Sequence, residues 1–214
     1  MGKAILVLGN SGRGKTASLR NMDPESFLYI NILSKDLPFK ASWKKYDKET
    51  NTGTVINTSN VPTIIEIIKK SNSLGRKIIV IDDTNYIMSN HFMKRISEKG
   101  YDKFSDMAKE FYDLFDAIKK SEEDLRVFVF AHTQENSSGE TSFKTIGKLV
   151  DEKISIEGLA TIVLGAFRTK EGYFFQTQTR HGFDTCKSPM GMFEEENIDN
   201  DLNKVIEIID EYYE

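Results

Sequence analysis

The chain has 214 residues, enough for one large domain with a substantial core. Hydrophobic residues make up 39% of it and charged residues 29%, which is typical of a globular protein and excludes a disordered one. The formal net charge of −4 argues against binding nucleic acid over the whole surface, because proteins that do so are normally basic.

The apolar stretches, the cysteine and the histidines indicate which compartment and which kind of protein to expect. No apolar stretch approaches membrane-spanning length, and the chain enters its first predicted strand directly, so we expect no signal peptide and no membrane contact. Cys186 is the single cysteine, and the three histidines lack zinc-ligand spacing. These features predict one domain over residues 1–214, in a reducing cytoplasm.

The first predicted elements are a strand and a helix joined by a glycine-rich loop. Residues 4–8 are apolar and predict a buried strand, and the helix is expected to end near residue 22. The loop between them has the full G-x-x-x-x-G-K-[ST] phosphate-binding pattern. Its residues, the predicted nucleotide contacts, are Gly9, Asn10, Ser11, Gly12, Arg13, Gly14, Lys15 and Thr16.

The chemistry of this loop predicts a site for ATP and Mg²⁺. Glycines allow successive backbone N–H groups to point at phosphate oxygens, beside the positive end of a helix. Lys15 is expected to reach the β- and γ-phosphates, and the Thr16 hydroxyl to ligate Mg²⁺.

The middle of the chain continues the alternation of strands and helices. Strands are predicted at 27–32 and 53–57, separated by a polar loop, and Asn60 is expected to cap a helix that begins near Pro62 and ends by Gly75. This alternation predicts a three-layer α/β fold with a mainly parallel sheet.

A strand at 77–83 ends in two carboxylates. Asp82 is expected to hold the water shell of Mg²⁺ at the carboxyl edge of the sheet, beside the phosphate loop. Asp83 is placed to polarise an attacking water, and the alternative is a solvated turn carboxylate.

The second half begins with helix, broken near Gly100, whose later piece carries an apolar stripe expected to pack on the sheet. A strand at 126–131 leads to His132, Thr133 and Gln134. His132 is a candidate contact to the γ-phosphate or the attacking water, with a simple strand-end role as the alternative, and Gln134 is a second candidate.

After Gln134 a polar loop is expected up to Lys148, with a mobile Ser-Ser-Gly centre. A hairpin is predicted from 161–167 and 173–179, and a C-terminal helix begins after Asn200 or Asp201. A phosphoryl-transfer site also needs positive charge, from this chain or a neighbouring subunit. The available residues are Lys144, Lys148, Arg168, Arg180 and Lys187, for each of which a plain surface charge is the alternative.

The phosphate loop, the strand ending in Asp82 and the 132–134 segment resemble the RecA-type ATPase core. The segments 144–153, 187–193 and 198–202 resemble bacteriophage RecA-like ATPases of the single-strand annealing recombinase group. The resemblance covers essentially the whole chain. It implies a minimal RecA-like core, in a bacterial host cell, that binds ATP and Mg²⁺, forms a ring or filament, binds single-stranded DNA and works with a phage single-strand-binding protein.

The resemblance also implies that the loop after Gln134 faces DNA, so that Lys144 and Lys148 contact DNA phosphates or a neighbour's nucleotide; Arg180 and Lys187 are further candidates. One departure concerns residues 31–34, which carry no carboxylate where RecA-like enzymes usually have a catalytic glutamate. Hydrolysis is therefore expected to be slow.

Three other functions compete with a DNA-stimulated ATPase. A small-molecule P-loop kinase would use an arginine-rich lid, and residues 135–143 contain no arginine. A GTPase would read guanine with T-K-x-D, but Gly172 replaces that Asp. An ATP-gated annealing scaffold, in which nucleotide only sets assembly, remains open beside the enzyme.

Overall fold

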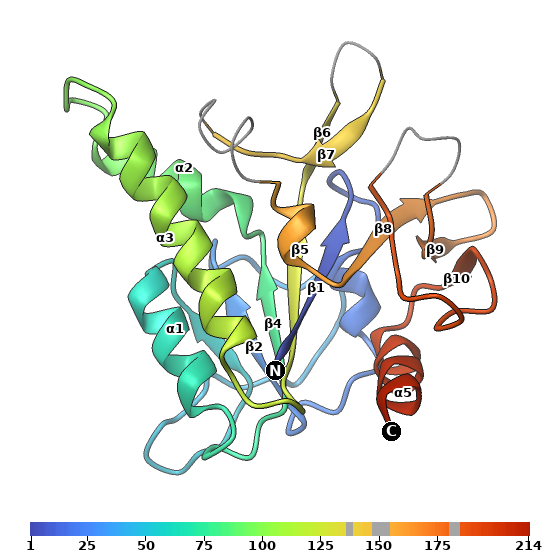
Figure 1. Cartoon of the computed structure of the whole chain (residues 1–214). Helices are drawn as coiled ribbons and strands as arrows, with labels where there is room; N and C mark the ends of the chain where they lie inside the picture. Colours follow the sequence, from blue (N-terminus) through green and yellow to red (C-terminus); the bar gives the residue numbers. More distant parts are fainter. Residues whose placement is uncertain (136–138, 147–154, 180–184) are drawn as a thin grey trace.

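The computed structural model describes residues 1–135, 139–146, 155–179 and 185–214. Its main feature is one large sheet (Figure 1). In this part of the chain, eight strands lie side by side in the order β10-β9-β8-β1-β5-β4-β2-β3. Their bounds are β1 Lys3–Leu8, β2 Phe27–Asn31, β3 Val55–Asn57, β4 Ile78–Asp82, β5 Arg126–Ala131, β8 Ile162–Arg168, β9 Tyr173–Gln176 and β10 Asn197–Asp199. The strands from β8 to β3 in this order pair in parallel, and β9 and β10 add an antiparallel edge.

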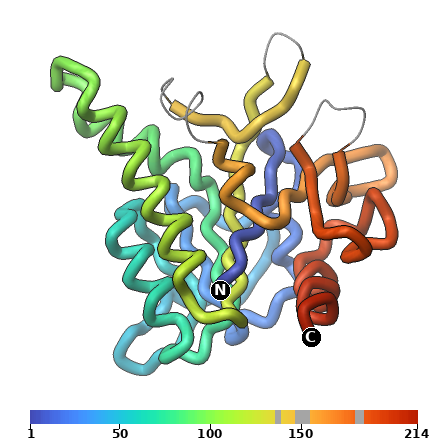
Figure 2. Tube along the Cα trace, viewed as in Figure 1, coloured from blue at the N-terminus to red at the C-terminus, as the bar shows by residue number. Residues whose placement is uncertain are grey.

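Helices cover both faces of the sheet and complete three layers (Figure 2). The helices α1 (Val61–Lys70), α2 (Asn85–Lys94) and α3 (Asp102–Lys119) pack on one face, and α5 (Leu202–Tyr213) packs on the other. Since side chains alternate along a strand, Leu6 of β1 faces the α3 layer while its neighbours Ile5 and Val7 face α5. The α/β prediction is confirmed, including the parallel sheet and the C-terminal hairpin and helix.

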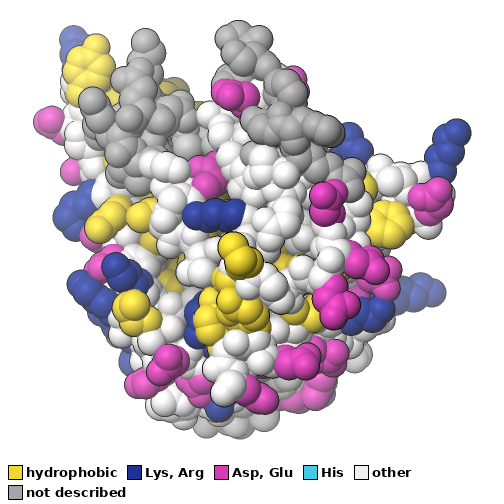
Figure 3. All heavy atoms as spheres, turned by 45° about the vertical axis from the view of Figure 1, so that its right-hand side comes forward, with side chains coloured by type: hydrophobic (Ala, Val, Ile, Leu, Met, Phe, Trp, Pro, Cys, Tyr) yellow, Lys and Arg dark blue, Asp and Glu magenta, His cyan; other side chains and the backbone are white. Residues whose placement is uncertain are grey.

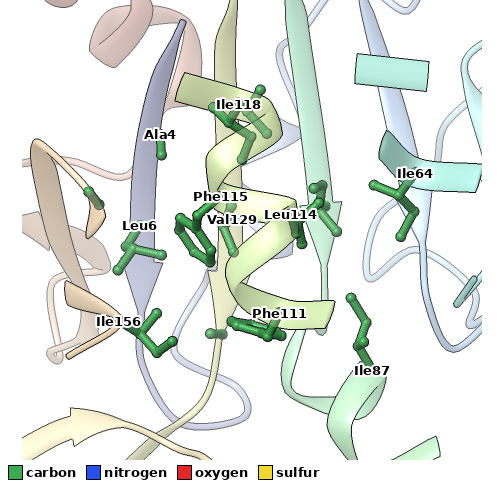
Figure 4. Packing of buried hydrophobic residues seen from close by; sticks show 14 of the residues in the cluster. Ala4, Leu6, Ile64, Ile87, Phe111, Leu114, Phe115, Ile118, Val129 and Ile156 are labelled. Atoms are coloured by element: carbon green, nitrogen blue, oxygen red, sulfur yellow. The ribbon is translucent and has the colours of Figure 1, made fainter. Parts of the chain in front are cut away.

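The apolar stripe of α3 packs on the sheet, as its spacing predicts. Phe111, Leu114, Phe115 and Ile118 are buried and lie over the β1 and β5 side chains (Figure 4). The predicted break near Gly100 is also present, because α2 ends before it and α3 begins after it, and this glycine has a φ of 95°. The stripe is therefore part of the core.

The predicted helix after the phosphate loop is wrong in length. Only one 3₁₀ turn forms, η1 (Thr16–Leu19), because the next side chains bond to the C-terminal segment. Arg20 donates to the carbonyl of Asn200 at 2.5 Å, and Asn21 donates to Asp201 at 2.7 Å. Pro24 follows three residues after Asn21 and disfavours helical backbone just before it.

The predicted loop after Gln134 is also wrong in part. Two short strands, β6 (Thr133–Glu135) and β7 (Thr141–Phe143), pair antiparallel above the carboxyl edge of the main sheet (Figure 1). Residues 136–138, between these strands in the sequence, lie outside the described residues, as do the greater part of the segment 144–153 and residues 180–184. No helix in the described part of the chain is both long and apolar enough to cross a membrane.

Two smaller elements were missed or refined. The strand β10 joins the edge of the predicted C-terminal hairpin, and the 3₁₀ turn η2 (Glu157–Leu159) precedes β8. Asp201 caps α5, since its side chain accepts from the backbone N–H of Asn203 at 3.1 Å.

Candidate nucleotide site

The phosphate loop follows β1 at the carboxyl edge of the sheet, and its backbone carbonyls bind the side chain of its own lysine. The Lys15 side chain is buried, and its Nζ donates to the carbonyls of Gly9 at 2.6 Å and Asn10 at 3.3 Å. Burial lowers the Lys15 pKa, while the charges of Asp82 and Asp83 act in the opposite direction. The ammonium is thus held at the base of the loop by the loop's own carbonyls.

Two glycines allow the backbone conformation of the phosphate loop. Gly12 and Gly14 have φ values of 75° and 97°, a backbone region that side chains disfavour. A Cβ on Gly14 would also meet the ring of Tyr173 at 2.7 Å. The loop and the start of β9 therefore pack without room for a side chain between them.

Asp82, at the end of β4, is buried against the loop. One of its oxygens accepts hydrogen bonds from the hydroxyls of Thr16 and Tyr29, each at 2.7 Å. Thr16 follows β1 and meets Asp82 across the intervening strand β5, whereas Tyr29 is on β2, the neighbour of β4 on its other side. Burial raises the Asp82 pKa, and the two hydroxyl donors oppose that rise.

Asp83 has a different environment, although it is the next residue. Its φ of 59° turns the chain out of β4, and the carboxylate contacts Lys35 at 2.9 Å and His132 at 3.1 Å. Burial raises the pKa of Asp83, but the hydrogen bonds from His132 and Lys35 outweigh burial and hold it at about 2. It is therefore a firmly ionised anchor for two cations or donors.

His132 links this carboxylate to the β6–β7 hairpin. Its backbone N–H donates to the side-chain oxygen of Asn85 at 2.5 Å, and its carbonyl accepts from the N–H of Lys144 at 2.9 Å. The Asn85 amide also donates to the Lys144 carbonyl, and Tyr86 meets the His132 ring edge-on. One buried asparagine thus joins α2, the end of β5 and the end of β7.

These side chains surround an open cavity of about 250 Å³. Its walls come from the phosphate loop, from the carboxyl ends of β2 and β4, and from Tyr173 on β9. The residues that line it are Ser11, Gly12, Arg13, Gly14, Lys15, Thr16, Ala17, Tyr29, Asn31, Lys35, Asp36, Pro38, Asp82, Asp83, His132 and Tyr173. Larger hollows exist elsewhere on the molecule, but this one has the convergent polar groups that a ligand site needs.

Comparisons with known proteins give a distant likeness to solved structures. No protein-family model and no curated protein matches the chain. Among solved structures, the P4 protein from bacteriophage phi6, in complex with ADP, is similar over 81% of this chain, with 13% identity and a TM-score of 0.41. The chain spans 57% of the length of that protein. A likeness this weak transfers neither ligand nor activity to this chain.

Most predicted nucleotide and catalytic residues come together. Lys15, Thr16, Asp82, Asp83 and His132 all line the cavity, as do loop residues 11–14. Gly9 and Asn10 do not line the cavity; their carbonyls accept hydrogen bonds from Lys15.

Gln134 lies apart from the cavity. Its side-chain oxygen accepts from the backbone N–H of Thr145 at 3.4 Å, so this side chain holds the hairpin. Among the other predicted cations, Lys144 and Lys187 do not line the cavity, and Lys187 pairs its backbone with Val163 at the sheet. Lys148 and Arg180 lie outside the described residues.

Sequence reasoning missed Tyr29, Lys35, Asn85 and Tyr173, four residues that line the site or support it. Tyr29 was hidden inside an apolar strand and Lys35 inside a segment interpreted as loop. One signal was available for Lys35, because residues after parallel strands gather at the same sheet edge. No sequence signal distinguished Asn85, since its partners are backbone groups 47 and 59 residues away.

Proposed function

We propose that this chain is a RecA-like P-loop ATPase that binds ATP with Mg²⁺ and hydrolyses it slowly. The observation that carries the proposal is the contact of Thr16 with Asp82 at 2.7 Å, beside the buried ammonium of Lys15. Thr16 and Asp82 are 66 positions apart in the sequence. With Lys15, they place a hydroxyl, a carboxylate and an ammonium group at one cavity.

The donor set at this contact fits Mg²⁺. The cation prefers oxygen ligands and keeps several waters, so it is usually bound by one or two protein oxygens together with substrate phosphates. Thr16 and Asp82 supply a hydroxyl and a carboxylate oxygen of that kind. When bound, Mg²⁺ neutralises charge that develops on the phosphates.

The chain's own residues would do the rest by positioning and charge. Backbone N–H groups of residues 11–16 and the Lys15 ammonium would hold the phosphate chain. Asp83 and His132 would lie on the side from which water approaches. No carboxylate stands at 31–34, and the Asn31 side chain bonds to the backbone of Lys35 instead. This supports slow hydrolysis.

The test measures nucleotide binding and phosphate release by the wild type, Lys15→Ala and an exposed-lysine control, Lys48→Ala. We expect binding of MgATP and slow turnover by the wild type and the control, and neither by Lys15→Ala. A wild-type protein that binds no nucleotide would overturn the proposal.

We further propose that ATP binding controls assembly on single-stranded DNA, as part of phage recombination by annealing. Support comes from the sequence resemblance and from the bonds that tie His132 in the site to the β6–β7 hairpin. The face formed by β8–β10 and α5 carries acidic and basic side chains interspersed (Figure 3). DNA contact is therefore proposed for a local region near Lys144, repeated in a ring or filament, with a phage single-strand-binding protein as partner.

Size-exclusion chromatography with a non-hydrolysable ATP analogue and an oligonucleotide tests this assembly. We expect a shift to larger species that needs both ligands and weakens in high salt, because phosphate contacts are salt-sensitive. A monomer that never shifts with DNA would contradict the recombination role while leaving nucleotide binding intact.

The engaged state of Asp83 favours a second candidate, an ATP-gated annealing scaffold that does not depend on hydrolysis. Both of its oxygens already have partners, and a carboxylate with a pKa of about 2 is a poor proton acceptor. Asp83→Ala separates the two functions. Loss of turnover with intact annealing favours the scaffold, and loss of both favours the enzyme.

A further inference from the structure

Lys35 reaches the cavity from an anchored backbone through a long, largely exposed side chain. Just after β2, Ser34 has a φ of 53° and turns the chain. The Asn31 side chain then bonds to both backbone groups of Lys35, accepting from its N–H at 3.2 Å and donating to its carbonyl at 2.8 Å. The lysine side chain beyond this anchor is 57% exposed.

The ammonium of Lys35 lies beside Asp83, in the cavity that the phosphate loop also lines. It contacts Asp83 at 2.9 Å and lies 5.4 Å from the centre of the Tyr86 ring. The Lys15 ammonium is bonded to carbonyls of the loop, and Lys35 lines the same cavity from the segment after β2. A phosphate chain bound at the loop would therefore share its cavity with two ammonium groups.

We propose that Lys35 is a γ-phosphate ligand supplied by the same chain, which leaves Asp83 for the terminal phosphate of a bound nucleoside triphosphate. The inference rests on the proposed ATP site and adds to it the group that distinguishes triphosphate from diphosphate. Among the described residues that line the cavity, the lysines and arginines are Arg13, Lys15 and Lys35, and only Lys35 lies outside the phosphate loop.

The exchange of partners is favourable on physical grounds. A half-exposed lysine–carboxylate pair is held weakly, because water screens it and the long side chain loses freedom when it is fixed. A terminal phosphate offers more charge and more acceptor oxygens than a single carboxylate. In phosphoryl transfer, positive charge at this position stabilises the transition state.

The move of Lys35 from Asp83 to the phosphate would also affect the β6–β7 hairpin, through His132. Once Lys35 leaves, Asp83 retains His132 as its charged or hydrogen-bonding partner. The backbone of His132 is bonded to Asn85 and to the end of β7. Presence of the γ-phosphate thus changes the balance of contacts at the base of the β6–β7 hairpin.

A simpler role for Lys35 makes a different prediction. If its contact with Asp83 only holds residues 34–36 against the sheet, removing the ammonium affects diphosphate and triphosphate equally or not at all. Selectivity for the γ-phosphate is therefore the property to measure.

The experiment compares magnesium complexes of ADP and of a non-hydrolysable ATP analogue by calorimetric titration. The proteins are the wild type, Lys35→Met, Lys35→Arg and Lys48→Ala; the methionine keeps the apolar stem, and Lys48 is an exposed lysine of the segment that follows. We expect Lys35→Met to weaken the analogue roughly 10-fold or more, as expected for one lost charge-assisted contact, with ADP within about 2-fold. Lys35→Arg should recover part of the loss, and Lys48→Ala should match the wild type.

Each outcome decides the inference. Equal weakening of both nucleotides, or none, overturns the role of Lys35 while the ATP site stands. A wild-type protein that binds neither nucleotide overturns the ATP site, and the role of Lys35 with it. Selective loss of the analogue supports both.

Discussion

The two neighbouring aspartates at the end of β4 lie in opposite halves of the same site. Asp82 is 4% exposed and accepts from two hydroxyls, whereas Asp83 contacts an exposed lysine and a histidine. Burial raises the pKa of Asp82, and partners hold the pKa of Asp83 at about 2. Asp82 is the last residue of β4, whereas the φ of 59° at Asp83 turns the chain out of the strand, so the two adjacent carboxylates meet different surroundings.

This contrast suggests that the two halves of the site have different roles, one in stability and binding and the other in function alone. The Asp82 half is built into the core through Thr16 and Tyr29, so changes there should affect folding as well as metal and nucleotide binding. The Asp83 half is assembled from residues beyond the strand ends whose side chains are partly or largely exposed, so changes there should affect function with little cost in stability. The predictions below test this division, in order of decreasing effect.

The largest effect is expected from Lys15→Ala in the buried half. The ammonium would contact two phosphates, so we expect ATP affinity to fall by about 30-fold or more, which is about 2 kcal/mol. Equilibrium titration with a fluorescent ATP analogue measures it. Unchanged affinity would show that the loop is not the nucleotide site.

Asp82→Asn should remove the magnesium dependence of nucleotide binding. The wild type should bind ATP roughly 10-fold or more tightly with Mg²⁺ than with a chelator, since a carboxylate ligand is worth at least one charged contact. In Asp82→Asn that ratio should approach one. Asp83→Asn is the matched control from the other half, and its ratio should stay close to that of the wild type; the same loss in both variants would contradict the division.

Asn85→Ala should loosen the connection between the halves and the hairpin. It removes the acceptor for the His132 N–H and the donor to the Lys144 carbonyl, at a cost of about 1–3 kcal/mol for buried groups left unpaired. Urea denaturation measures the loss. The exposed Asn72→Ala is the control and should unfold like the wild type.

Tyr29→Phe should cost about 1–2 kcal/mol of unfolding free energy, because buried Asp82 loses a hydroxyl donor while the ring stays packed. Trp43, the single tryptophan, lies 5.5 Å from the Tyr29 ring and provides the fluorescence signal for denaturation. Tyr112→Phe, on the exposed side of α3, should change stability by much less. A stability equal to the wild type would mean that the Tyr29 hydroxyl contributes nothing to the buried half.

Lys35→Ala should have the smallest effect on stability, at most about 0.5 kcal/mol, because its ion pair is half exposed. The same denaturation assay measures it. A loss as large as that of Tyr29→Phe would place Lys35 with the buried half and remove the contrast.

Local patterns predicted much of the site. Lys15 and Thr16 belong to a contiguous motif, and Asp82 ends an apolar strand, so both the residues and their edge of the sheet followed from order along the chain. The α/β layers followed from the alternation of strands and helices. These features depend on periodicity and short spacing, which a sequence displays directly.

Other features depended on pairing between distant segments. The helix expected after Thr16 became one turn because Arg20 and Asn21 bond to residues 180 positions away. The hairpin after His132 forms around Asn85, whose partners are backbone groups with no sequence signature.

By itself, the sequence determined the phosphate loop, the strand order in the chain and the carboxylates at the end of β4. Only the tertiary structure decided that Asp82 meets Thr16 and Tyr29 while Asp83 meets Lys35 and His132. The physical reason is that strand register and burial set the partners of each carboxylate, and these depend on segments far apart in the chain.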